Sequence, residues 1–168
     1  MRRFVVIVMV CALVFVVFTA AASAKSVDRP FKGTISGTVW FQPVGGVLTT
    51  FSSAVGNASH MGRVQMTAQH PTPIADPNNY GPGDMILAAA NGDEVLITHT
   101  GHLELDLTAA PGTWFVGSGS VTIVGGTGRF ADASGSVEMI LHLQYPGSLD
   151  PAFYPWAAWW TWDGTIRY

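Results

Sequence analysis

Residues 113–144 read TWFVGSGSVTIV, GGTGRFADASG and SVEMILHLQ, two alternating stretches joined by a glycine-rich connection. In 113–124 and again in 136–144, apolar or small side chains alternate with polar ones, and this period of two is typical of half-buried β-strands. The connection at 125–135 has glycines where a chain can turn tightly. The stretch therefore predicts two neighbouring antiparallel strands.

The same pattern recurs through the rest of residues 25–168, where no window repeats apolar residues at helical spacing for three turns. Further strands are predicted at 33–40, 47–56, 63–69, 85–90, 94–107 and 158–168. Proline-containing segments at 71–83 and 146–155 predict loops, and Asn91-Gly92-Asp93 predicts a hairpin turn. About eight strands with mostly short connections favour consecutive antiparallel neighbours.

Two architectures fit this pattern, a β-sandwich and a closed barrel. Eight is the strand number at which an up-and-down barrel closes around its own side chains or one small ligand. Closure also removes the exposed sheet edges that invite aggregation. We therefore predict an all-β fold, an eight-stranded antiparallel closed β-barrel that follows a cleaved signal peptide.

The N-terminus predicts export. Met1-Arg2-Arg3 is positive, residues 4–18 are apolar, and a small-residue stretch ends in Ala22-Ser23-Ala24. This is the order of a secretory signal peptide cut before Lys25. The apolar run is shorter than the roughly 20 residues of a membrane-spanning helix, although an uncleaved anchor stays the alternative. The expected organisation is a signal peptide at 1–24 and one barrel domain at 25–168, in a secreted or periplasmic protein.

Composition narrows the function classes. Of the 168 residues, 48% are apolar and 11% are charged, and acidic residues outnumber basic ones by 11 to 8. An acidic chain of this kind is a poor partner for nucleic acid. The only cysteine, Cys11, lies in the predicted signal peptide, so the exported chain has no thiol or disulfide chemistry. No sequence feature indicates a cofactor.

The connection at 125–135 also carries a resemblance. Gly125-Gly126-Thr127-Gly128-Arg129-Phe130 resembles the GGTGRF-type segment of the allene oxide cyclase and dirigent protein superfamily, which consists of small eight-stranded barrels. Residues 31–38, 58–63 and 89–93 resemble secreted bacterial members of that barrel group, most of them without assigned function. The resemblance covers residues 31–144 in pattern and implies the same fold. Such barrels often form dimers or trimers through their outer faces, so a homo-oligomer is an open alternative.

What the resemblance implies about chemistry is limited. Allene oxide cyclases steer a reactive substrate in an apolar lumen without a cofactor, but their polar residues do not align one by one with this sequence. The segment itself predicts a corner that caps the barrel, with a positive φ at Gly128 and Phe130 as a plug. A phosphate-binding loop is rejected, because the residues after it alternate as a strand and form no helix.

Two histidine positions are candidates for chemistry. His99 falls on the strand face that carries Val95 and Ile97, where it is either a hydrogen-bonded core residue or, in a lumen, a general acid or base. Glu94 is a weaker catalytic candidate. His102, Glu104 and Asp106 would project from one strand face at ~6.5 Å steps. They could hold a divalent metal, but a water-facing strand looks the same, and we predict no metal site.

The C-terminal residues 156–162 contain four of the six tryptophans. Because side chains alternate along a strand, Trp160 and Trp162 share one face and Trp159 lies on the other. On the inner face they would pack the core or form a floor for an apolar or ring-shaped ligand. On the outer face they would indicate an interface or a sugar platform.

Three functions from different classes remain. The first is a secreted module that binds a small hydrophobic molecule in the lumen. Its predicted lining is Phe51, His99, Phe115, Trp160 and Trp162. The second is a cofactor-free isomerase or cyclase in which His99 or Glu94 moves a proton. The third is an outer-membrane barrel, although His99 and the glycines at 101, 117 and 119 would make a poor lipid-facing band.

Overall fold

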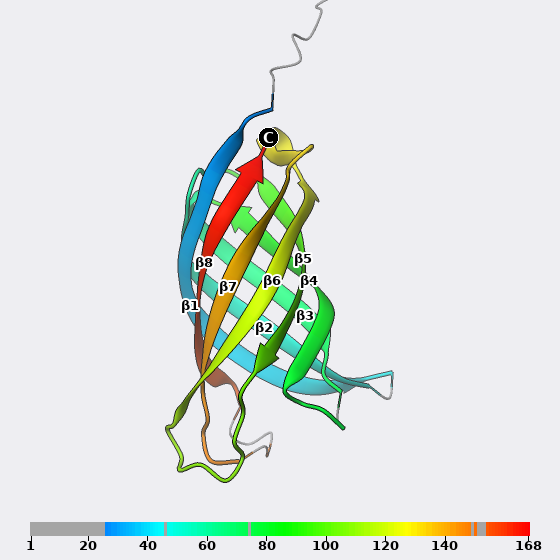
Figure 1. The fold of residues 1–168 in the computed structure, drawn as a ribbon, viewed down its shortest axis with the longest axis vertical. Coiled ribbons are helices and arrows are strands. Elements are labelled where there is room, and N and C mark those ends of the chain that lie inside the picture. The colour runs from blue at the N-terminus through cyan, green and yellow to red at the C-terminus, as the bar shows by residue number, and fades with distance from the viewer. Residues whose placement is uncertain (1–25, 46, 74, 149, 151–153) are drawn as a thin grey trace, which may run out of the picture.

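The computed structural model describes residues 26–45, 47–73, 75–148, 150 and 154–168, and the predicted signal peptide lies outside them. The described chain forms one closed barrel in which eight antiparallel strands follow each other in chain order (Figure 1). These strands are β1 (Asp28–Val44), β2 (Val47–Ala58), β3 (Gly62–Pro71), β4 (Asn79–Ala89), β5 (Glu94–Leu103), β6 (Trp114–Gly126), β7 (Ser134–Gln144) and β8 (Trp156–Arg167). The predicted fold class is confirmed.

The barrel closes where the first and last strands pair. The register of β1 with β8 runs from Asp28 opposite Arg167 to Val39 opposite Trp156. Arg167 donates two hydrogen bonds to the Asp28 carboxylate, at 2.7 and 2.9 Å. Because both side chains are exposed, this ion pair adds little stability. The long backbone ladder is therefore what holds the seam together.

Strand alternation places the core inside the barrel. Along β8, Trp156, Ala158, Trp160 and Trp162 are buried, whereas the residues between them are exposed or half-buried. The other strands repeat this pattern, with one shift in β4 between Tyr80 and Gly83, so the alternate side chains of every strand face inward. Among the described residues no helix is long and apolar enough to cross a membrane.

The two ends of the barrel differ, and we name them by their packing. The closed end holds both termini of the barrel and the turns after β2, β4 and β6, at the top of Figure 1. Phe31, Phe130 and Ile166 are fully buried there. The open end carries the connections after β1, β3, β5 and β7, at the bottom of Figure 1.

The predicted corner at 125–135 caps the closed end. Gly128 has a φ of +56° and begins η1 (Gly128–Phe130), a short 3-10 helix that delivers Phe130 into the core at 0% exposure. Thr127 accepts a hydrogen bond from the Glu94 amide at 3.0 Å, which ties the corner to β5. The positive φ and the plug were both predicted from the sequence, and both are confirmed. The hairpin turn at 91–93 is confirmed too, with Gly92 at a φ of +88°.

Two strand boundaries differ from the sequence prediction. β4 begins at Asn79, inside the segment predicted as a loop, because a register shift between Tyr80 and Gly83 lets the strand continue past Pro82. β5 ends at Leu103 and not at residue 107. Beyond it, the Asp106 carboxylate accepts hydrogen bonds from the Thr108 amide and hydroxyl, as in a turn.

Candidate functional site

A cavity of about 420 Å³ enters the barrel from the open end. Its lining comes from strands and from open-end connections. The lining residues are Val39, Phe41, Pro43, Leu48, Thr50, Ser52, Met66, Ala68, His70, Thr72, Pro77, Tyr80, Met85, His99, Leu103, Leu105, Leu107, Met139, Leu141, Leu143, Tyr154 and Trp160. None of them is Asp, Glu, Lys or Arg, so the cavity is apolar with a few polar positions.

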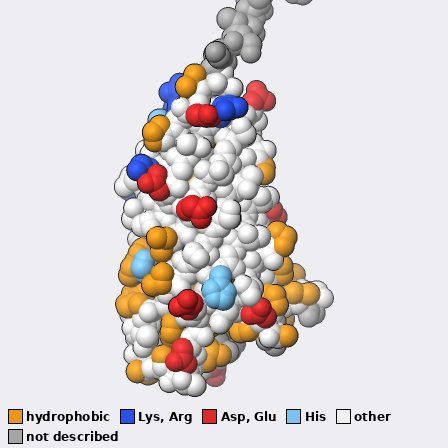
Figure 2. Space-filling model, in the orientation of Figure 1, with side chains coloured by type: hydrophobic (Ala, Val, Ile, Leu, Met, Phe, Trp, Pro, Cys, Tyr) orange, Lys and Arg blue, Asp and Glu red, His pale blue; other side chains and the backbone are white. Residues whose placement is uncertain are grey.

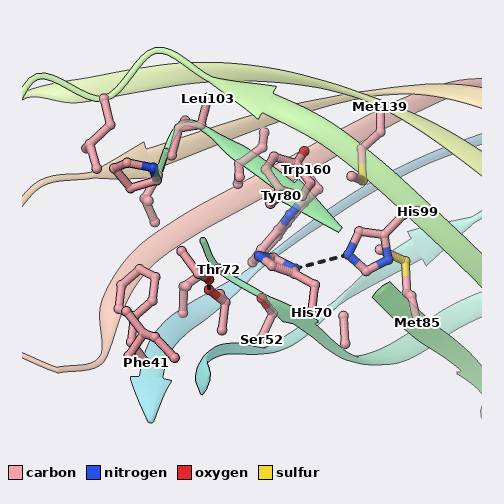
Figure 3. A pocket seen from close by; sticks show the side chains of 18 of the residues that line it. Phe41, Ser52, His70, Thr72, Tyr80, Met85, His99, Leu103, Met139 and Trp160 are labelled. Atoms are coloured by element: carbon pink, nitrogen blue, oxygen red, sulfur yellow. Dashed lines mark hydrogen bonds between the residues drawn. The ribbon is translucent and has the colours of Figure 1, made fainter. Parts of the chain in front are cut away.

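Most of the polar positions lie on one wall, and Tyr154, which packs against Phe41, is the exception. Thr50 and Ser52 come from β2, His70 from β3, Tyr80 from β4 and His99 from β5, all on the inward face of their strands. The opposite wall consists of apolar side chains and Trp160, from β1, β7 and β8. Figure 3 shows the two histidines between Phe41, nearer the mouth, and the Met85 and Met139 side chains, deeper in the barrel. The cavity thus has an amphipathic cross-section.

The two histidines form a pair. Nδ1 of His70 and Nε2 of His99 lie 3.2 Å apart and share one hydrogen bond, drawn as a dashed line in Figure 3. The Tyr80 ring stacks on His70 with centroids 4.8 Å apart. Gly83 makes room for this group, since a Cβ there would lie 2.4 Å from His70 Cβ and 2.8 Å from His99 Cε1. A glycine at this strand position is therefore part of the site.

Burial keeps both imidazoles neutral. It lowers the pKa of His70 to about 3, and the neighbouring His99 lowers it further in the same direction. The pKa of His99 is also lowered by burial, against smaller opposing effects of the Asp84 charge and the Gly83 backbone. At neutral pH the pair therefore carries no charge and holds two protons over four ring nitrogens.

Tyr80 has a buried hydroxyl that makes no hydrogen bond among the described residues. It fits a notch left by two inward-facing glycines, because a Cβ at Gly101 or Gly119 would lie 2.1 or 3.0 Å from the phenol oxygen. Burial raises the pKa of Tyr80 to about 12, so the phenol stays protonated. Nearby, the hydroxyls of Thr50 and Thr72 hydrogen-bond to each other across the end of β2 and β3.

Of the five residues predicted to line the lumen, His99 and Trp160 do so. Trp162 faces inward but lies deeper, on a separate void of about 10 Å³. Phe115 is buried and packs against Tyr145, with ring centroids 6.1 Å apart, and does not line the cavity. Whether any of them binds a ligand stays a prediction.

The lumen position predicted for Phe51 is wrong. Phe51 is half-buried on the outer face of β2, where it stacks on Trp40 with centroids 5.7 Å apart. Its neighbours Thr50 and Ser52 face inward instead, and their hydroxyl side chains carry no hydrophobic signal that would have predicted this. Glu94 is also outside the cavity, since it begins β5 at the closed end and its neighbour Val95 faces inward.

His70 and Tyr80 line the cavity but were not predicted from the sequence. The predicted third strand stopped at Gln69, one residue short of His70, although the inward series Val64, Met66 and Ala68 continues to it. Extending that series by one step would have found the residue. Tyr80 lay inside the proline-containing segment predicted as a loop, and no local signal placed it in a strand.

The row His102, Glu104 and Asp106 does not form, because the strand ends at Leu103. His102 instead hydrogen-bonds through Nδ1 to Oδ1 of Asn79, at 2.9 Å. The described residues contain no group of three or more His, Cys, Asp or Glu side chains placed to hold a metal ion.

Fold and cavity together define the class: a closed eight-stranded antiparallel barrel with an uncharged cavity at one end. Comparison with protein-family models, with curated proteins and with solved structures finds no match to the chain. The cavity is therefore the main evidence on function.

Proposed function

We propose that this protein binds a small hydrophobic molecule in the barrel cavity and is exported to do so. The observation that carries the proposal is the cavity itself, about 420 Å³ with an uncharged lining. That volume lies within the range of roughly 300 to 1,000 Å³ typical of small-molecule sites. Burying apolar ligand surface there contributes about 25 cal/mol per Å² before the costs of association.

The histidine pair bears on the alternative of a cofactor-free isomerase or cyclase. His99 does face the cavity, which is the feature such an enzyme needs. A general base, however, works best with a pKa near the operating pH. With a pKa of about 3, His70 is a weak base at neutral pH, and burial also lowers the pKa of His99. The pair is better suited to hold a ligand's polar group than to remove a proton.

The outer surface bears on the alternative of an outer-membrane barrel. Such barrels carry an apolar band outside and polar side chains inside. Here the exposed positions of β3 include Arg63, Gln65 and Thr67, whereas Val64 and Met66 are buried between them. Ser118, Ser120 and Thr122 are likewise exposed on β6. This arrangement supports a barrel surrounded by water.

A neutral fluorescent probe, N-phenyl-1-naphthylamine, tests the proposal. We expect it to bind the purified protein with enhanced emission and to quench tryptophan, because Trp160 lines the cavity. Ala68→Phe should fill the cavity and weaken binding at least about tenfold. Thr67→Phe, one residue away on the exposed face, should bind as the parent does.

The proposal fails if the parent protein binds no such probe. It fails equally if Ala68→Phe folds, as judged by circular dichroism, and binds with unchanged affinity. In that case the probe would occupy another surface.

A further inference from the structure

Charged side chains are segregated along the barrel. All Lys and Arg side chains that the structure describes lie on strands or turns at the closed end: Arg29, Lys32, Arg63, Arg129 and Arg167. In Figure 2 the blue side chains occur only in the upper half of the visible face. Three of these cations are already in ion pairs, with Asp163, Asp93 and Asp28.

The open end carries charges of one sign. Asp76 follows β3, Glu104 and Asp106 follow β5, and Asp150 precedes β8, so four acidic residues lie on connections around the mouth. In the described residues no Lys or Arg accompanies them there. A molecule that enters the cavity thus passes a negative rim, which repels anions and whose effect weakens with salt.

Among the described residues that line it, the cavity has no cationic group that could stabilise a bound anion. Its lining contains no Lys or Arg, and its two histidines are neutral. A carboxylate that leaves water without a cationic partner loses its hydration at a cost of several kcal/mol, so it stays outside or binds as the neutral acid.

The histidine pair can satisfy a neutral polar group. When His99 donates to His70, Nε2 of His70 carries a proton and can donate. When the shared proton belongs to His70, Nε2 of His70 becomes an acceptor. The same atom can therefore meet either a carbonyl or a hydroxyl, and no hydrogen bond within the described residues occupies it.

From this geometry we propose that the cavity selects its ligand by charge: it takes a neutral apolar molecule with one hydroxyl or carbonyl and excludes the carboxylate of the same skeleton. This inference rests on the proposed function and goes one step further, from hydrophobic ligands in general to neutral ones. The residues that carry it are the four acidic rim residues, the histidine pair and the uncharged lining.

Displacement of N-phenyl-1-naphthylamine by three matched ligands tests the selection. Decan-1-ol, methyl decanoate and decanoate share an unbranched ten-carbon chain, and only decanoate is charged at pH 7.5. We expect the alcohol and the ester to displace the probe, and decanoate to be at least about tenfold weaker than its methyl ester. Raising the salt concentration should narrow that gap only in part, because salt screens the rim and not the interior.

The outcomes separate the two proposals. If decanoate displaces the probe as well as its methyl ester does, selection by charge is overturned while the binding function stands. If the probe binds and none of the three ligands displaces it, the cavity does not bind neutral ligands with this chain, and the selection is again overturned. If the probe itself does not bind, the proposed function falls and takes this inference with it.

A charge placed at the mouth gives a second test. Leu107 lines the cavity and is 40% exposed, so Leu107→Lys puts an ammonium beside the entrance. We expect the affinity for decanoate relative to that for its methyl ester to rise severalfold, because only decanoate interacts with the added charge. Val124→Lys, at a 56% exposed position near the closed end, adds the same charge elsewhere and should leave that ratio as in the parent. Equal ratios in the two variants would overturn the electrostatic argument.

Discussion

The closed end and the open end are built from the same strands with the same alternation, yet one is filled and the other is hollow. At the closed end the inward positions hold Phe31, Phe130 and Trp162, which are at most 7% exposed. At the open end the inward positions of β2 hold Thr50 and Ser52. A barrel of this strand number can be filled by side chains or can hold a small ligand. The size of the inward residues decides which of the two occurs.

Met85 and Met139 mark the boundary between the two regions. Both contact the main cavity, and both also line the void of about 10 Å³ beside Trp162. Methionine is unbranched and fills irregular space in several rotamers. The floor of the cavity is therefore its most adaptable part, while the closed end beyond it is filled by the rigid rings of Phe31, Phe130 and Trp162.

The largest expected difference between the ends is in packing energy. Phe130→Ala removes a ring that is 0% exposed and should lower the free energy of unfolding by about 3 to 5 kcal/mol. Leu105→Ala, in a half-buried residue at the mouth, should cost less than about 1.5 kcal/mol, because its side chain already borders open space. Urea unfolding of both variants measures this. Equal losses would mean that the open end is packed as tightly as the plug.

Acid should destabilise the protein because His70, which lines the cavity of the open end, has a lowered pKa in the folded state. The unfolded chain binds a proton at His70 near pH 6.5, whereas the folded chain does so only near pH 3. Between these values the unfolded state holds more protons, so stability falls as the pH falls, by about 1.4 kcal/mol per pH unit for this group. The lowered pKa of His99 acts in the same direction. From pH 7 to pH 5 the loss assigned to His70 is about 2 kcal/mol.

His70→Gln should remove that contribution, and His102→Gln is the matched control on the exposed face of β5. Urea unfolding at pH 7 and pH 5 gives the slope for each variant. A parent-like slope in His70→Gln would assign the acid sensitivity to other groups. A reduced slope in His102→Gln would show that the histidine pair is not its source.

Substitution of Gly83, which packs against the histidine pair, should cost more stability than substitution of a glycine that has open space around it. A Cβ at Gly83 would lie 2.5 Å from the Gln69 carbonyl oxygen as well as close to both rings. Backbone cannot move away cheaply, so Gly83→Ala should cost about 1 to 3 kcal/mol. Gly45→Ala, where nothing lies within 4 Å, should cost about 1 kcal/mol from its positive φ alone. Thermal unfolding compares the two, and the reverse order would contradict the close packing.

Much of the fold could be predicted from the sequence, and the reason is physical. Alternation is a local signal, and it predicted the strands around 94–99, 114–124 and 136–144 together with the turn at Gly92. The glycine-rich corner was predicted because a positive φ and a buried aromatic at Phe130 follow from local chemistry. Eight strands and the removal of exposed edges favoured a closed barrel over a sandwich.

The site was harder to predict, because it depends on register and on neighbours far apart in sequence. His70 meets His99 only because β3 and β5 flank the same strand, and Gly83 on that strand leaves the space between their rings. No local sequence signal at either histidine predicts that the two are in contact. Phe51 shows the opposite error, since hydrophobicity suggested the lumen while the strand's own alternation placed it outside.

The smallest expected effect concerns Tyr80, and it separates a structural role from a binding role. Its buried hydroxyl has no hydrogen-bond partner among the described residues, so it already bears the cost of desolvation. Tyr80→Phe should therefore change the free energy of unfolding by less than about 1 kcal/mol and can even raise it. Thr50→Val is the contrasting variant, because it breaks the hydrogen bond to Thr72 and leaves a buried hydroxyl alone, at about 1 to 3 kcal/mol.

Removing the Tyr80 hydroxyl should also have little effect on ligand affinity. The phenol oxygen of Tyr80 lies in the notch over Gly101 and Gly119, directed toward backbone and not toward the opposite wall. Decan-1-ol should then bind Tyr80→Phe within about twofold of the parent, whereas His70→Gln, which replaces the ring that faces the cavity, should bind it more weakly. A large loss of decan-1-ol affinity in Tyr80→Phe alone would show that the phenol, and not the imidazole pair, binds the hydroxyl of the ligand. It would also mean that the glycine notch opens when a ligand enters.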